Sequence, residues 1–529
     1  MVVTDEPARI SECDVGWTVT GSARAAMGTL ATGALAMALL IAAAPAVADE
    51  PVYVRPFSHW ENIAAPEDGA DIMRRQMAII DKLDVRVELN FHRGEFQAAW
   101  MAIHAPDVVS KIKQHRYEVA YHPHPVRPFT DIVAGMSNMS WDDAVAAYTD
   151  LERCAVDYAT AEVDCSRPGG AEVVKSVFGK PLVGVANGGP DAVATYVYKH
   201  VLGIPTQLDS GTASYDDIFG DAYMYWYMGQ LVFKNPGFAR WKVFAERPVG
   251  PAVAALPGEG PHLLSVVVSD KLWNTTINEQ IDAAWYQGAT LASVAPTNRS
   301  PVGKVNAWLD RYERVLRDLK GQAKRSGGGY LHTSEVLALV HPVEETLSAA
   351  ELHTAAEAYL AQTAQRPPLG VSAGPGKVIS LTDLYEGLVK SLAAYRETGA
   401  VPAQVTTTGL LGPIGDRAVP GGAGQGTLAA SDLLVALPQL TDRVPIRVDV
   451  GGAGGSIYAT EMLWLLSRLY VQVRDGTPDA ALQRSSSVLR LEPQGSPIPT
   501  QRSDTAKRGS RFDGYTVLQY WTAKPVRWR

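Results

Sequence analysis

The sequence predicts an α/β fold in which parallel strands alternate with helices and close into a barrel of about seven strands. Short runs, several of them apolar on both faces as in buried parallel sheets, predict strands at 52–57, 85–91, 117–121, 181–186, 206–209, 262–269 and 329–333. Runs with apolar residues three and four positions apart predict the intervening helices, at 70–83, 105–115, 141–159 and 191–203. Alternation of this kind is typical of a parallel sheet or barrel.

The predicted strands fade after about residue 340, where a mainly helical region is expected. Two similar stretches, 380–399 and 456–476, each open with Ser and close on Gly, which predicts an N-cap, a helix and a C-cap. The expected division of the chain is a signal peptide (1–48), a barrel domain (49–340), a helix and linker (341–376), a helical repeat region (377–482) and a tail (483–529).

An apolar run near the amino terminus is typical of a secretory signal. Arg9 and Arg24 precede it, and the small residues Ala46 and Ala48 place the expected cleavage before Asp49. No later run has about 18 uninterrupted apolar residues, so we expect no membrane span after cleavage. The expected location is therefore outside the cytoplasm, secreted or in the cell envelope.

Composition narrows the class of protein further. The 46% hydrophobic and 20% charged residues describe a globular chain, and the formal net charge of -8 argues against nucleic acid as the partner, because phosphate binding needs clustered Lys and Arg. Of the three cysteines, Cys13 falls in the signal. Cys154 and Cys165 are expected either to form a disulfide in an oxidising compartment or to stay as two buried thiols.

The stretch YEVAYHPHPVRPF (117–129) carries the clearest chemical signal. The prolines at 123 and 125 push His122 and His124 out of the α region and toward extended geometry. Residues two apart in an extended segment point to the same side, and imidazoles are common ligands of divalent ions such as zinc. The competing interpretation is a proline-rich surface turn that carries two solvated histidines.

Polar residues also follow the neighbouring predicted strands. The first strand leads into His59 and Glu61, and the second leads into His92. Since reactive residues of parallel α/β domains lie where strands end and loops begin, these side chains are placed to converge with His122. His92 fits a partly buried, hydrogen-bonded residue as well as it fits a ligand.

The stretch LDVRVELNFHRGEFQAAWMAIHAPDVVSKIKQHRYEVAYHPHP (83–125) resembles the central part of the polysaccharide deacetylase (NodB-homology) family. CSRPGG (165–170) resembles that family's Arg-Pro motif, and VVVSDKLW (266–273) resembles one of its later strand motifs. The resemblance covers 52–335. It implies a distorted (β/α) barrel of about seven strands, whose members remove acetyl groups from extracellular polysaccharides with a divalent metal.

The resemblance also implies roles for single residues. His122 matches the family's first metal-binding histidine, and the His-x-His-Pro form of divergent members adds His124. SHWEN stands where the family usually ends its first strand with paired aspartates. His59 is therefore the expected third ligand of a zinc-type ion and Glu61 the expected base, with these two roles open to exchange. The ion would lower the pKa of a bound water and polarise the acetyl carbonyl.

Arg167 and Asp270 complete the expected site. Arg167 would orient a carboxylate, and Asp270 would hold a catalytic group. The alternatives are a surface ion pair for Arg167 and a helix or turn cap for Asp270. A glycosidase that uses Glu61 and Asp270 is also open, and it would need the two carboxyls about 5 to 10 Å apart.

A different class of function stays open beside the hydrolase. The two C-terminal helical stretches resemble pseudomurein-binding-type repeats, a cell-wall-binding module. Together with SHWEN in place of the family's paired aspartates, this resemblance favours a catalytically inactive envelope protein that binds a polysaccharide or cell-wall glycan. The aromatic run YMYWYMGQLVF (223–233) fits a sugar-stacking surface, and more often such a run is core or an inter-domain contact.

Overall fold

The computed structural model of the chain describes residues 50–60, 65–92, 94, 97–123, 135–136, 139–157, 162–186, 191–208, 219, 222–234, 240–242, 248–256, 260–269, 272–273, 299–362, 366–414, 426–451, 455–484, 490–491, 493 and 510–529. The predicted signal peptide lies outside these residues. No helix within these ranges is both long enough and apolar enough to cross a membrane.

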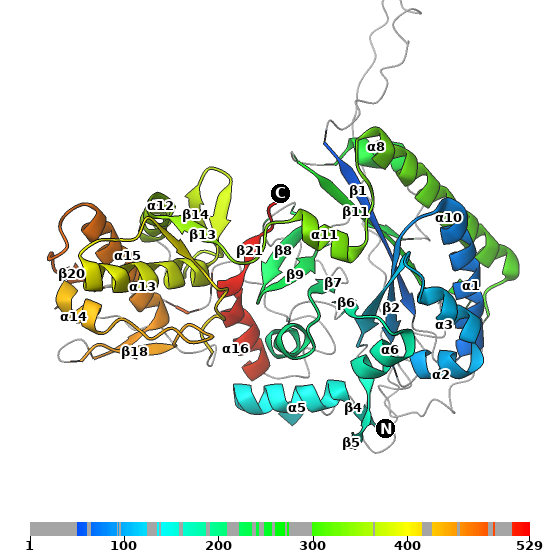
Figure 1. The fold of residues 1–529 in the computed structure, drawn as a ribbon, viewed down its shortest axis with the longest axis horizontal. Helices are drawn as coiled ribbons and strands as arrows, with labels where there is room; N and C mark the ends of the chain where they lie inside the picture. Colours follow the sequence, from blue (N-terminus) through cyan, green and yellow to red (C-terminus); the bar gives the residue numbers. More distant parts are fainter. Residues whose placement is uncertain are drawn as a thin grey trace, which may run out of the picture. The chain divides into compact units, whose positions relative to one another are not determined.

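A single large sheet organises the first part of the chain (Figure 1). Its strands follow the order β10 (Arg240–Lys242), β11 (His262–Ser269), β1 (Val52–Trp60), β2 (Val87–His92), β3 (Tyr117–His122), β6 (Leu182–Val185), β7 (Thr206–Leu208), β9 (Gln230–Phe233), β8 (Met224–Tyr227) and β21 (Lys524–Pro525). The short strand β12 (Gly329–Tyr330) pairs with β1. Every neighbouring pair from β10 to β9 is parallel. The predicted α/β class is therefore confirmed.

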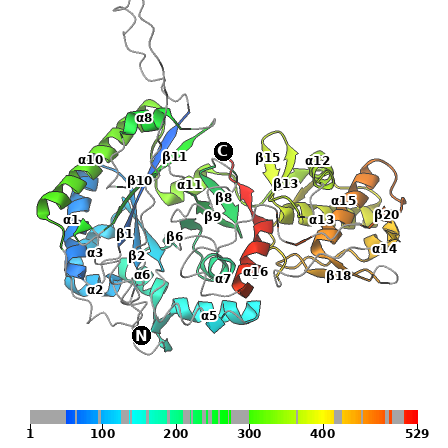
Figure 2. The ribbon, with the colours of Figure 1, turned by 180° about the vertical axis from the view of Figure 1, so that it is seen from behind.

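Helices alternate with the strands of this part of the chain, as the pattern predicts. They are α1 (Pro66–Leu83), α2 (Gln97–His104), α3 (Pro106–Ile112), α5 (Trp141–Arg153), α6 (Gly170–Phe178), α7 (Ala192–Tyr196) continued by a π-helix (Val197–Val201), α8 (Val249–Ala254), α10 (Val302–Arg325) and α11 (Thr333–Leu339). In both ribbon views α1 and α10 run beside each other along the side of β1 and β2 (Figure 2). Helix α1 buries Ile72, Met73 and Met77 on one face and ends at Asp84 in the left-handed conformation.

The sheet curls into a half-barrel. The guanidinium of Arg55 on β1 lies 4.0 Å from the ring centre of Phe233 on β9, although four strands separate β1 from β9 in the sheet order. Near the two ends of the sheet, the Tyr223 hydroxyl and His262 Nδ1 are 2.9 Å apart. A buried apolar cluster fills the concave side with residues that include Phe57, Phe233 and Val267. Among the described residues no strand pairing closes the barrel.

The region after residue 345 contains the same unit twice. The first copy runs β13 (Thr346–Ser348), α12 (Ala349–Leu360), the hairpin β14 (Val371–Gly374) and β15 (Lys377–Ile379), α13 (Leu381–Thr398) and β16 (Gln404–Thr406). The second runs β17 (Thr427–Leu428), α14 (Ala430–Val435), the hairpin β18 (Arg447–Asp449) and β19 (Ser456–Tyr458), α15 (Ala459–Arg474) and β20 (Leu482–Gln483). In each copy the first strand pairs antiparallel with the last.

This duplication corrects two predictions. The end of the expected helix and linker segment 341–376 instead carries strand β14 of the first hairpin, with Val371 and Ala373 buried. The expected N-cap Ser456 instead pairs with Asp449 in the second hairpin, so α15 begins three residues later. The cap prediction holds for α13, where Ser380 accepts a hydrogen bond from the Asp383 N–H and the helix ends at Gly399 in the left-handed conformation. The weak helical repeat is thus part of a longer structural one.

The C-terminal segment completes the large sheet. After α16 (Ser510–Gln519) and a 3-10 turn (Tyr520–Thr522), β21 pairs with β8. The Met228 N–H donates to Thr522 Oγ1 at 2.8 Å, and the Tyr227 hydroxyl donates to the carbonyl of Thr516 at 3.0 Å. The aromatic run 223–233 forms the β8–β9 hairpin, in which Tyr225 and Tyr227 are fully buried. This burial places them in the core and not on a sugar-stacking surface.

Candidate functional site

Three histidines lie at the carboxyl ends of three neighbouring parallel strands. His59 is near the end of β1, His92 ends β2 and His122 ends β3. His92 is directly opposite His122, and His59 is opposite Asn90. Because alternate strand residues face the same side, this register turns all three imidazoles toward the concave side of the sheet, which also contains Phe57.

The three imidazoles form one compact, buried cluster. The ring centres of His59 and His122 are 4.8 Å apart, and those of His92 and His122 are 6.2 Å apart. His59 and His122 are 8% exposed and His92 is 1% exposed. His122 Nδ1 lies 2.6 Å from the Ala186 carbonyl, which requires Nδ1 to carry the proton. In this tautomer the ring's lone pair is on Nε2, the arrangement found in many metal-binding histidines.

Buried charges lie one layer below the histidines on the same face of the sheet. Arg55 and Glu88 form an ion pair of 2.9 Å, and both side chains are at most 3% exposed. Asn90 Nδ2 donates to the second Glu88 oxygen at 2.9 Å, so Glu88 connects this pair to the layer that contains His59. Burial lowers the pKa of Arg55, and the neighbouring Glu88 opposes that shift. Burial also raises the pKa of Glu118, which lies opposite Glu88 on the neighbouring strand β3.

The structure brings together two of the predicted ligands, His59 and His122. Glu61, His124 and Asp270 lie outside the described residues, so their predicted roles stay predictions.

Arg167 does not join the cluster. It lies on β5 (Val163–Pro168), which pairs only with β4 (Cys154–Val156) among the described strands. Its side chain is 65% exposed and its Nε is 2.7 Å from an oxygen of Asp164, as expected for the surface ion pair.

His92 is the residue that sequence reasoning undervalued. It is the last of six consecutive buried residues, and the neighbouring strand ends in His122 at the same level. The signal that could have found it is the equal length of the two runs from Val87 and Tyr117 to their histidines. Equal lengths in parallel, in-register strands place the two imidazoles side by side.

Metal-ligand geometry is not tight in the histidine cluster. Within the described ranges, one group of three or more His, Cys, Asp or Glu residues has ligand atoms that all lie within 4.8 Å of one another, and it is Asp150, Cys154 and Cys165. The nitrogens of the three clustered histidines are therefore spaced more widely than this. Cys154 and Cys165 are joined by a disulfide, with Cα atoms 4.4 Å apart, so their sulfurs are not thiolate ligands. Of the two alternatives for these cysteines, the structure has the disulfide and not the two buried thiols. The predicted helix 141–159 instead ends at Arg153, and β4 begins at the next residue, Cys154.

Comparison with known proteins gives no family. No protein-family model matches the chain, and no curated protein matches it. Among solved structures, the chain is similar to the 4-alpha-glucanotransferase from Thermococcus litoralis, with 10% identity, a TM-score of 0.32, and coverage of 55% of this chain and 41% of that one. It is also similar to the YdjI aldolase from Escherichia coli K12, with 8% identity, a TM-score of 0.22, and coverage of 52% and 92%.

The chain thus covers less than half the length of the glucanotransferase. At these TM-scores, neither likeness supports an argument about fold or activity.

Proposed function

We propose that the chain is a metal-dependent hydrolase that removes acetyl groups from a polysaccharide or cell-wall glycan. The observation that carries the proposal is the meeting of His59, His92 and His122 at the carboxyl ends of β1, β2 and β3. Parallel α/β enzymes place their chemistry at this end of the sheet. The half-barrel curl supports the finer proposal of a distorted (β/α) barrel of the deacetylase type.

The donor set fits a divalent ion such as zinc. The cluster consists of imidazoles, and the Ala186 carbonyl holds His122 in the tautomer whose lone pair is on Nε2. A bound ion would supply Lewis acidity toward the acyl carbonyl and would lower the pKa of a water molecule. The chain's own residues would orient the ligands, with the Asn90 and Glu88 pair behind them, and Glu61 is the proposed base. The ring centres of His59 and His92 now lie 4.8 Å and 6.2 Å from that of His122. Modest side-chain rotation would bring one nitrogen of each ring to about 2 Å from a common ion.

The proposed location is outside the cytoplasm. The apolar run that ends at Ala48 and the Cys154–Cys165 disulfide both support export, because structural disulfides persist in oxidising compartments. A glycan of the cell surface is then the accessible substrate class.

The proposal is tested by metal content and deacetylation together. Purified chain, loaded with zinc and desalted, should retain about one ion per chain by elemental analysis. It should also release acetate from an acetylated glycan oligomer. His122→Gln and His92→Gln should each lose the ion and the acetate release. His104→Gln, an exposed histidine at the end of α2, is the matched control and should change neither. Wild-type protein that retains no ion would refute the proposal.

A second candidate is an envelope protein that binds glycan without catalysis. The duplicated unit at 346–406 and 427–483 favours it, because tandem copies present the same surface twice and gain avidity for a repetitive polymer. The loose spacing of the histidine nitrogens favours it as well. Retention on cell-wall material by wild-type chain, with no metal bound and no acetate released, would support this function over the hydrolase.

A further inference from the structure

A cavity lies at the opposite end of the strands from the histidines. Its volume is about 600 Å³, and it is lined by the residues that immediately precede β2 and β3, by the start of β12 and by the end of α10. This volume falls within the roughly 300 to 1,000 Å³ of small-molecule sites. The histidine cluster is at the carboxyl ends of the same strands, so the two sites do not overlap.

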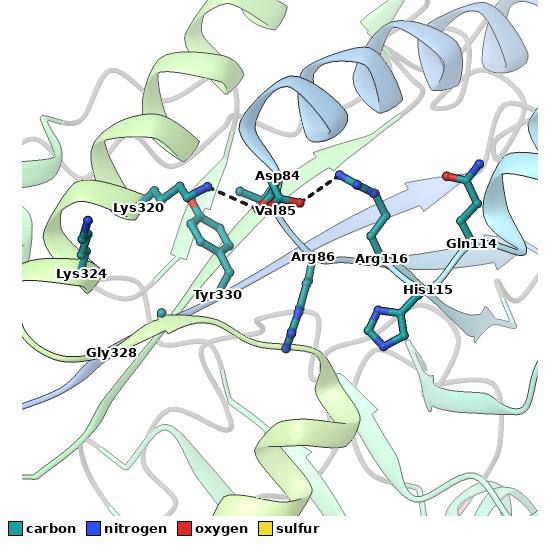
Figure 3. A pocket seen from close by; sticks show the side chains of 11 residues that line it. Asp84, Val85, Arg86, Gln114, His115, Arg116, Lys320, Lys324, Gly328 and Tyr330 are labelled. Carbon is teal, nitrogen blue, oxygen red and sulfur yellow. Dashed lines mark hydrogen bonds and ion pairs between the residues drawn. The ribbon is translucent and has the colours of Figure 1, made fainter.

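The lining is basic in a chain whose net charge is -8. Four cationic side chains line it from three separate segments, against one lining carboxylate, Asp84: Arg86, Arg116, Lys320 and Lys324. Figure 3 shows Lys320 and Arg116 directed toward Asp84 and Arg86 directed away from it. Arg86 pairs with Glu335, and Arg116 is 3.4 Å from Asp84 and 3.6 Å from Asp81. These acids neutralise the two arginines in part.

The two lysines lack such compensation. Lys320 Nζ donates to the backbone carbonyls of Leu83 and Asp84, which carry no net charge. No ion pair joins Lys320 or Lys324 to a carboxylate among the described residues. The two positions are four apart on α10, so both ammonium groups face the same side, and like charges at this spacing repel. Two uncompensated positive charges therefore face one cavity.

The remaining walls suit the organic part of a ligand. Tyr330 and Val85 give the cavity apolar surface, and the Tyr330 hydroxyl is engaged by the Leu316 carbonyl. Gly329 contributes only backbone, and a Cβ added there would meet nothing within 4 Å. Gly328 has no such freedom, because a Cβ would lie 2.1 Å from the Val52 carbonyl oxygen. The floor of the cavity is thus open backbone next to an aromatic ring.

We propose that this cavity binds a phosphate monoester. A monoester carries close to two negative charges at neutral pH, which matches the two uncompensated lysines, whereas a carboxylate or phosphodiester would leave one charge unbalanced. Arg116 also lines the cavity, and guanidinium groups bind phosphate oxygens in pairs. A sugar or similar small group would occupy the space between Tyr330 and Gly329. This site is independent of the proposed hydrolase chemistry.

Isothermal titration of the full chain with glucose 6-phosphate, at constant ionic strength, tests the proposal. We expect saturable binding of one ligand per chain, weaker binding of inorganic phosphate, and at least about tenfold weaker binding of a sugar methyl phosphodiester. Affinity should also fall as the pH drops below about 6, where the monoester gains its second proton.

Matched variants locate the site. Lys320→Gln/Lys324→Gln should weaken glucose 6-phosphate binding at least about tenfold, and both side chains are exposed, so the fold should be kept. Lys304→Gln, on the same helix over Trp308, should bind as wild type, and so should His122→Gln. Absence of saturable binding in the wild type, equal binding by the double variant, or equal binding of monoester and diester would each overturn the proposal.

Discussion

Removing one partner of the buried Arg55–Glu88 ion pair should lower the free energy of unfolding several times more than removing one partner of a surface pair. The two side chains are 1% and 3% exposed and their closest atoms are 2.9 Å apart. At an effective dielectric constant of about 20, this separation gives an attraction of about 6 kcal/mol, which is largely offset by the loss of hydration. Arg55→Met removes the cation and leaves the carboxylate buried. We expect the free energy of unfolding to fall by about 3 to 5 kcal/mol.

Urea unfolding at pH 7, followed by circular dichroism, measures this loss. Arg74→Met is the matched control, because Arg74 and Asp107 form a 2.7 Å pair whose side chains are 44% and 58% exposed. That substitution should cost less than about 1 kcal/mol. Arg55→Met/Glu88→Gln should recover most of the loss, since Gln can still pair with Asn90 and Thr333. If Arg55→Met costs no more than Arg74→Met, the burial argument is wrong.

Two further predictions concern pH and chain length. Burial lowers the pKa of His332 from its ordinary 6.5 to about 4. As the pH falls, this imidazole is therefore protonated in the unfolded chain before it is protonated in the folded one. The free energy of unfolding should fall by at most roughly 3 kcal/mol as the pH drops from 6.5 to 4. His332→Gln should flatten that part of the unfolding-versus-pH curve, and an unchanged slope would contradict the assignment. A chain that ends at Gly374 should aggregate on gel filtration, because it lacks β21 and the buried Tyr515 and Tyr520; a soluble monomer would show instead that the sheet is stable without its last strand.

The parallel strands of the sheet were predictable because each is a short apolar run with its own local signal. The runs at 52–57, 117–121 and 262–269 all became strands of one sheet. The β8–β9 hairpin was not predicted, since a dense aromatic run does not show which residues turn. Strand β21 has two residues and pairs with a partner far along the chain, so no local pattern marks it.

The candidate site was partly predictable for a related reason. Register follows from run length, so the approach of His59 and His122 could be expected from sequence. Tight metal geometry depends on side-chain rotation, which sequence periodicity does not encode. The two copies of the repeated unit were visible only as similar helices, because their hairpins and closing strands are two to four residues long.

The pairing of β21 with β8 also affects how the chain must fold. Lys524 pairs with Trp226, so about 300 residues of polypeptide emerge between the two partners. The loop that this contact closes is long, and contacts of such sequence separation slow folding. This edge of the sheet therefore stays unpaired until residues 524–525 have been made, and during that interval β8 is an open edge strand that can pair with wrong partners.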